Sequence, residues 1–188
     1  MDQSDSVPAA RYRRIADGFT ARAQAVAPEA WGNPAPCAGW VARDVVRHLV
    51  EWFPPFLEGG AGIVLPAGPS VDTDPLGAWT ALDEGVRGVF DAPDIATRRF
   101  EHDRAGSHML GDAIDMFFTG DVLIHTWDLA RATGGDESLD RDEVHRMLVG
   151  IEPLDEMLRG SGQYGPRVVV PDDADEQTRL IAFVGRQP

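Results

Sequence analysis

Residues 113–134 read AIDMFFTGDVLIHTWDLARATG, and they carry the strongest helical pattern in the chain. Apolar residues recur at helical spacing, and a Gly-Gly pair follows as a typical C-terminal stop. With the residues before it, this pattern predicts a long helix from His108 to Thr133. At about 100° per residue, three polar side chains fall inside the apolar stripe of that helix. They are Asp121, His125 and Asp128.

Polar groups in an apolar stripe need partners, because burying them without one costs several kcal/mol. A divalent ion is one such partner, since an Asp and a His four residues apart on a helix can direct two ligand atoms at one centre. Two other interpretations remain open at this point. Asp121 can accept a hydrogen bond from His125 as a satisfied pair, or the stripe can lie at a solvent-facing edge of the fold.

His48 favours the metal interpretation. A second helix is predicted from Val41 to about Leu57, with Pro54 and Pro55 expected to kink or end it. His48 lies on the apolar face of this helix, among Val41, Val45, Trp52 and Phe56. If this helix packs against the one that carries Asp121 and His125, three ligands meet. Three protein ligands leave a coordination position open, as in catalytic rather than structural metal sites.

The rest of the sequence is predicted to be mainly helical. Further helices are expected at 8–27, 76–90 and 174–184, and a helix capped by Asp140 is expected to run to about Arg159 with a break at Pro153. A Gly- and Pro-rich loop spans 59–75, and short extended pieces are expected at 98–100 and 168–170. Long amphipathic helices with few strand signals indicate an all-α helical bundle, and 188 residues fit a single domain, 1–188.

Composition excludes several classes of protein. The net charge of −14 argues against a nucleic-acid partner, because an acidic surface repels phosphates. No apolar run approaches the roughly 20 residues that cross a bilayer, so no membrane association is expected. The N-terminal segment has no apolar stretch after its basic residues, so it is not a secretory signal, and a cytoplasmic protein is expected.

Several other residues are candidates for function. Cys37 is the single cysteine, and it is either a nucleophile or metal ligand or, as the sequence favours, a buried structural residue. His102 and His108 are candidates for the mouth of a cavity, whereas His145 lies among charged residues and is expected at the surface. The aromatic residues of the two stripes either line a substrate pocket or, as such spacing favours, belong to the core: Trp52, Phe56, Phe117 and Phe118.

Two segments in this order resemble a known family. They are PAPCAGWVARDVVRHLVEW at 34–52 and DVLIHTWDLARATG at 121–134. They resemble mycothiol-dependent maleylpyruvate isomerase and its relatives, metal-binding proteins of the DinB-like four-helix-bundle superfamily, and the resemblance runs along nearly the whole chain. The segment at 161–186 resembles the end of a subfamily of metal-binding proteins. The implied fold is a DinB-like bundle with additional C-terminal helices.

The resemblance implies a ligand set and a chemistry. It places the metal ligands on His48, Asp121 and His125, and makes Asp128 an outer acid that orients a ligand, handles a proton or binds substrate. The isomerases often carry Glu at the position of Asp121. They also have a C-terminal domain that contributes to the active site, for which this chain is too short. The maleylpyruvate substrate itself is therefore not expected.

Two classes of function follow from this site. The first is a metal-dependent thiol S-transferase or isomerase, with zinc or alternatively nickel as the ion, mycothiol as co-substrate and a small electrophile or thiol as partner. The second is a metal- or ligand-binding stress module without turnover. Hydrolysis by a metal-bound water is the rival enzymatic chemistry, and a homodimer is left open.

Overall fold

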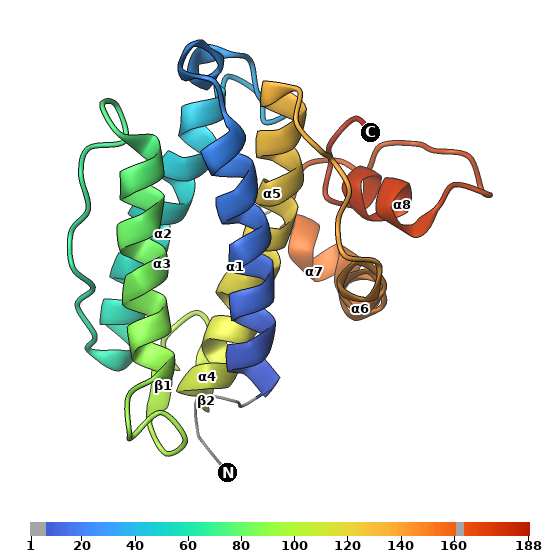
Figure 1. Cartoon of the computed structure of the whole chain (residues 1–188). Helices are drawn as coiled ribbons and strands as arrows, with labels where there is room; N and C mark the ends of the chain where they lie inside the picture. The colour runs from blue at the N-terminus through green and yellow to red at the C-terminus, as the bar shows by residue number, and fades with distance from the viewer. Residues whose placement is uncertain (1–6, 161–163) are drawn as a thin grey trace.

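The structure is a computed structural model that describes residues 7–160 and 164–188. It confirms the expected all-α, DinB-like bundle of four rods with additional helices at the C-terminal end (Figure 1). Three rods are single helices: α1 (Val7–Ala25), α2 (Ala42–Ala61) and α3 (Pro75–Phe90). The fourth consists of α4 (Leu110–Ala113), the π-helical segment η3 (Ile114–Thr119) and α5 (Gly120–Thr133). A 3-10 helix, η2 (Pro28–Gly32), lies between α1 and α2.

The core forms where the apolar faces of the rods meet. Helices α1 and α2 each pack against both α3 and the fourth rod. The inward face of α1 is the one its spacing predicts, with Tyr12, Phe19 and Ala23 all buried. Phe53 of α2 stacks on Phe118 of η3 with ring centroids 3.8 Å apart, and both rings are fully buried. Aromatic packing therefore fixes α2 against the fourth rod.

Helix α2 does not end at its proline pair. The sequence predicts a kink or an end at Pro54 and Pro55, but the helix continues to Ala61, where Gly62 closes it with a φ of 64°. Proline removes backbone hydrogen bonds, yet its own φ is compatible with a helix. Phe53 and Leu57 lie on either side of the pair and are both buried. Burial of these side chains offsets the missing hydrogen bonds, so the predicted end was wrong.

A β-hairpin precedes the fourth rod, where the sequence predicts only a short extended piece. Strand β1 (Arg99–His102) pairs antiparallel with β2 (Gly106–Met109), and Phe100 faces His108 in the register. The prediction that the long helix begins at His108 was therefore wrong. Phe100 is buried against the end of α2, and a Cβ on Gly60 would come within 2.1 Å of its ring. The absence of a side chain at residue 60 lets the hairpin lie directly on α2.

The π-helical segment is the second departure from the predicted long helix. A π turn holds more residues than an α turn, so α-helical spacing does not give the position of Ile114 or Phe118 relative to Asp121 across it. Arg11 of α1 donates to the backbone oxygen of Asp115 at 3.3 Å and to its carboxylate at 2.7 Å. Asp121, His125 and Asp128 all lie in the regular helix α5, so their predicted relation is retained.

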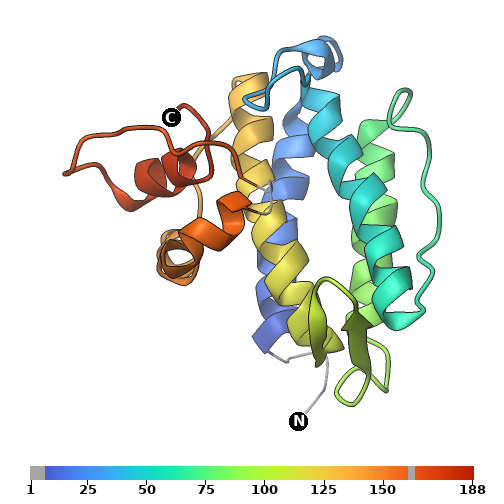
Figure 2. The ribbon, with the colours of Figure 1, turned by 180° about the vertical axis from the view of Figure 1, so that it is seen from behind.

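The C-terminal helices lie beside α5, outside the bundle (Figures 1 and 2). Gly134 ends α5 with a φ of 70°, and Asp140 caps α6 (Arg141–Ile151), both as predicted. Pro153 lies in the expected break, η4 (Glu152–Leu154), which leads into α7 (Asp155–Gly160). Helix α8 (Glu176–Phe183) packs on α6. Among the described residues, no helix combines the length and the apolar character needed to cross a membrane.

The predicted strand at 168–170 is not present. No strand among residues 7–160 and 164–188 pairs with this segment, and the Val168 N–H donates to the Ala182 oxygen at 2.9 Å. Val169 is 94% exposed. An apolar run of three valines is typical of a strand, but a strand forms a sheet only where a neighbouring strand pairs with it.

Candidate metal centre

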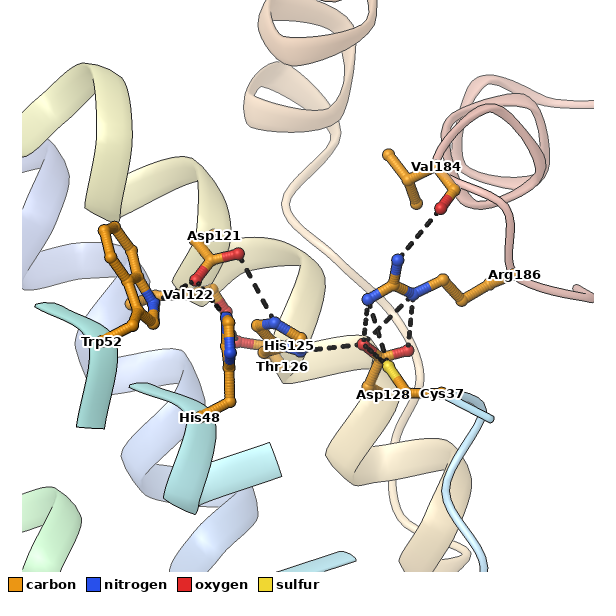
Figure 3. Close-up of polar contacts among 10 residues, drawn as sticks. All are labelled: Cys37, His48, Trp52, Asp121, Val122, His125, Thr126, Asp128, Val184 and Arg186. Carbon is orange, nitrogen blue, oxygen red and sulfur yellow. Dashed lines mark hydrogen bonds and ion pairs between the residues drawn. The ribbon is translucent and has the colours of Figure 1, made fainter. Parts of the chain in front are cut away.

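Helices α2 and α5 bring three predicted ligands together. His48 comes from α2, and Asp121 and His125 come from successive turns of α5. His48 Nε2 lies 3.2 Å from Asp121 Oδ2, and His125 Nε2 lies 3.4 Å from Asp121 Oδ1. One ligand atom from each residue lies within 4.8 Å of the other two. Each imidazole thus faces a different oxygen of one carboxylate (Figure 3).

Aromatic side chains hold these groups in place. The Trp52 indole Nε1–H donates to Asp121 Oδ2 at 2.9 Å. The Trp40 ring lies 5.3 Å from the His48 ring and 5.9 Å from that of His125, measured between centroids. Trp52 lies one helical turn beyond His48, so the predicted stripe of α2 supplies both a predicted ligand and the group that orients the Asp121 carboxylate.

The site stabilises positive charge next to Asp121. Desolvation raises the pKa of Asp121, but the charges of His125 and His48 and the hydrogen bonds from His48 and Trp52 outweigh it, so the pKa is lowered. Desolvation likewise lowers the pKa of His125, but the nearby Asp121 and Asp128 raise it by more, so that pKa is raised. The ionised carboxylate therefore favours a cation beside it, between the two imidazole rings.

A second cluster lies on the other side of the His125 ring. His125 Nδ1 is 2.9 Å from Asp128 Oδ2, an ion-pair contact between the ring and the buried carboxylate. Cys37 Sγ lies 3.6 Å from the same oxygen. One ligand atom each of Cys37, His125 and Asp128 lies within 4.8 Å of the other two, so this cluster also has metal-ligand spacing.

Arg186 distinguishes the two clusters. Its Nη2 donates to Asp128 Oδ2 at 3.0 Å and to Cys37 Sγ at 3.2 Å. A guanidinium is permanently charged, so the second cluster already contains its cation. The first cluster contains only histidines beside its carboxylate. Two imidazole nitrogens and a carboxylate oxygen are also ligands that zinc prefers, so a divalent ion fits His48, Asp121 and His125.

The first cluster is also the accessible one. The side chains of His48 and Asp121 are 32% and 24% exposed, whereas Asp128 is fully buried. Asp128 thus faces the buried side of His125 rather than the exposed side of the site. Burial together with the Asp128 charge raises the pKa of Cys37 to about 12, which keeps its thiol protonated. The thiol is therefore protonated at neutral pH, and it contacts both Asp128 and Arg186.

The remaining histidines lie elsewhere. His108 Nε2 is 2.7 Å from the Ala105 oxygen within the hairpin, and the His102 ring packs 5.0 Å from that of Phe56. Neither belongs to a cluster with metal-ligand spacing among the described residues. The His145 side chain is 62% exposed and contacts Glu176, as expected for a surface residue. Of the four aromatic candidates, Phe118 is core, while Trp52, Phe56 and Phe117 are only partly buried.

Sequence reasoning missed three residues around this site. Trp40 precedes α2, whereas Tyr164 and Arg186 belong to the C-terminal segment. Burial raises the pKa of Tyr164 to about 12, and the charge of Asp121 adds to the rise. Neither Tyr164 nor Arg186 lies in a helix, so helical periodicity carries no signal for them. Trp40 had a signal, because it stands within the segment 34–52 that carries the family resemblance.

Comparison with known proteins gives the family of the chain. Two uncharacterized proteins of Mycobacterium tuberculosis, MT0763 of strain CDC 1551 / Oshkosh and Rv0738 of strain ATCC 25618 / H37Rv, are each 28% identical to this chain over 186 residues. The matches cover 95% of this chain and 97% of each relative. No solved structure matches significantly. The family described as mycothiol maleylpyruvate isomerase N-terminal domain matches residues 12–130, which include His48, Asp121 and His125, and the chain belongs to this family.

Proposed function

We propose that this protein binds one divalent metal ion through His48, Asp121 and His125 and acts as a metal-dependent thiol S-transferase or isomerase. Zinc is the favoured ion and nickel the alternative, with mycothiol as co-substrate and a small electrophile as partner. The observation that carries the proposal is the meeting of three ligand atoms from two helices within 4.8 Å, around a carboxylate whose ion-pair partners in the described chain are histidines.

Each residue of the site has a role in the proposal. His48 and His125 each direct Nε2 at a different oxygen of Asp121, and Trp52 holds the Asp121 carboxylate through its indole N–H. Asp128 lies against Nδ1 of His125 and fixes the orientation of that ring. A divalent ion at this site would supply the charge that keeps a bound thiol deprotonated near neutral pH.

The thiol in this proposal comes from outside the chain. The sequence contains one cysteine, and its pKa of about 12 leaves almost no thiolate at neutral pH. Cys37 also contacts Asp128 and Arg186 rather than the exposed side of the site. A nucleophilic thiolate is therefore expected from a small co-substrate, and family membership favours mycothiol.

Metal content tests the first half of the proposal. Elemental analysis of the purified protein should give one divalent ion per chain, and His125→Ala should remove it. His145→Ala is the matched control, because this exposed histidine also pairs with a carboxylate but lies outside the cluster. If His125→Ala and His145→Ala retain equal amounts of metal, the ligand assignment is wrong.

Thiol binding tests the second half. The cobalt-loaded protein should change its visible spectrum when mycothiol is added, because sulfur would join the ligands of the ion. The same addition to the His125→Ala variant should cause no change. A cobalt-loaded protein whose spectrum does not respond to saturating mycothiol would contradict the thiol-dependent function, and would favour metal-dependent hydrolysis or binding without turnover.

A further inference from the structure

The C-terminal tail reaches back to the bundle through Arg186. This residue follows α8 by three positions and lies outside residues 12–130, which match the family. Its Nε lies 3.3 Å from each oxygen of Asp128, and its Nη2 lies 3.0 Å from Oδ2. Nη2 also contacts Cys37 Sγ, in the segment before α2. One guanidinium thus joins the tail, helix α5 and the start of α2 (Figure 3).

Arg186 has no nitrogen left over for a ligand. Nε and Nη2 point to Asp128 and Cys37, and Nη1 donates to the Val184 backbone oxygen at 3.0 Å. The side chain is 14% exposed, and that of Asp128 is fully buried. A guanidinium held in this way is an internal counter-ion, not an anion-binding group.

The effect of this pair falls on His125. Asp128 Oδ2, the oxygen that accepts from Arg186 Nη2, is also the oxygen 2.9 Å from His125 Nδ1. A fixed Asp128 carboxylate therefore fixes which ring nitrogen of His125 is turned inward. It directs Nε2 toward Asp121 and His48, where the proposed metal binds. Partners of this kind around a metal-binding histidine set its tautomer and its orientation.

We propose that Arg186 is a positioning residue for the metal site, which holds Asp128 against His125 and so keeps the Nε2 atom of His125 directed at the ion. The inference rests on the proposed metal site and extends it beyond the residues that match the family. The C-terminal segment of the same chain would then complete a site whose ligands all come from the bundle.

Two measurements test this role. The first is the tautomer of His125 in the metal-free protein, observed by nitrogen NMR at a pH where the ring is neutral. The wild type should place the proton on Nδ1, and Arg186→Ala should give a mixture of both tautomers. The second is cobalt affinity from competition with a chelator, which Arg186→Ala should lower by about 10-fold. Arg186→Lys keeps the positive charge but loses the paired N–H donors of the guanidinium. Its cobalt affinity should lie between those of the wild type and Arg186→Ala.

Arg159→Ala is the matched control. Arg159 also anchors the C-terminal segment, through the backbone oxygens of Gly165 and Phe183, but it does not contact Asp128. If the tail serves only to stabilise the fold, Arg159→Ala and Arg186→Ala will lower cobalt affinity equally, and the inference fails. An unchanged tautomer in both Arg186 variants also overturns it. If Arg186→Ala does not fold, Arg186→Lys decides through the same two readouts.

The outcomes separate this inference from the proposed function. A wild-type protein that binds no cobalt would refute the proposed metal site. The tautomer measurement needs no metal, so it would still show whether Arg186 orders His125. Conversely, normal cobalt binding in both Arg186 variants, with the wild-type tautomer, would leave the metal site in place and refute the role of Arg186.

Discussion

Asp121 and Asp128 lie two turns apart on α5 and flank the same imidazole ring, yet their surroundings differ in kind. Asp121 is 24% exposed, and its ion-pair partners in the described chain are His48 and His125, whose charge depends on a proton. Asp128 is fully buried, and its counter-ion is Arg186, whose guanidinium carries a permanent positive charge. Spacing alone allows a metal at either carboxylate. The difference in counter-ion indicates which of them is left for an external cation.

The largely buried cluster of Cys37, Asp128 and Arg186 forms the closed side of the His125 ring. The reactivity of the Cys37 thiol is the most sensitive measure of how well this side excludes water. With a pKa of about 12, the native thiol should react with a disulfide reagent at neutral pH about 1,000-fold more slowly than the thiol of the unfolded chain. Thiolate forms only as the pH rises through the pKa, so the native rate should keep rising toward pH 12. Stability should correspondingly fall between the unfolded and folded pKa values, because the folded state holds its proton more tightly there. Equal rates in the native and denatured protein at pH 7 would show that this side is open.

Removing the two carboxylates should have unequal effects on folding. Asp128→Ala leaves Arg186 as a buried charge without its main partner, and should lower the free energy of unfolding by about 3 kcal/mol. Asp121→Ala should lower it by about 1 kcal/mol, because Trp52 and His48 lose a partner at a position that water can reach. Urea denaturation of the metal-free variants measures both values. Equal losses would remove the distinction between a carboxylate with a permanent internal counter-ion and one that faces histidines and an indole.

The partly exposed cluster of His48, Asp121 and His125 forms the open side of the site. The hydrogen bond from Trp52 to Asp121 tests whether metal affinity depends on this side. Trp52→Phe keeps an aromatic ring but removes the N–H that donates to Asp121, and should lower metal affinity by about 10-fold. Trp79→Phe is the control, because the buried Trp79 donates its N–H to Thr20, away from the site. Metal competition assays should therefore separate the two variants. A similar loss of affinity in both would mean that the effect comes from core packing.

The smallest effect is expected where the C-terminal segment only packs. Asp140 caps α6 by accepting from the N–H groups of Asp142 and Glu143. Asp140→Ala should lower the free energy of unfolding by about 1 kcal/mol in urea denaturation. Metal affinity should stay within about twofold of the wild type, as expected for distant sites without shared partners. A larger loss would mean that α6, and not only the tail, supports the site.

The residues of the open side could be predicted from the sequence because they lie in regular helices. His48 stood out as a polar residue in the apolar stripe of α2, and Asp121 and His125 stood out in that of α5. Helical periodicity reports directly which side chains share a face. Local end signals correctly predicted the stop at Gly134 and the cap at Asp140, because both depend on the chemistry of the residue itself.

The contacts of the closed side could not be predicted in the same way. Arg186 reaches Asp128 only because the chain after α8 turns back to α5, and no local pattern encodes that path. The prolines of α2 failed as a helix end because burial of Phe53 and Leu57 outweighs the lost hydrogen bonds. The valines at 168–170 failed as a strand because sheet formation needs a partner. In all three cases tertiary contacts decide the outcome.

The π-helical segment also affects how the chain can change over evolution. Deleting one residue from Ile114–Thr119 would let the fourth rod continue as an ordinary α-helix. The spacing of Asp121, His125 and Asp128 would not change, because all three lie after the segment. The hairpin before it would keep its direction relative to α5, because a π turn and an α turn complete the same rotation with a difference of about one residue. When relatives are aligned, a one-residue gap at this place therefore marks the loss of the π turn, with the hairpin and the three polar residues of α5 still in the same relative orientation.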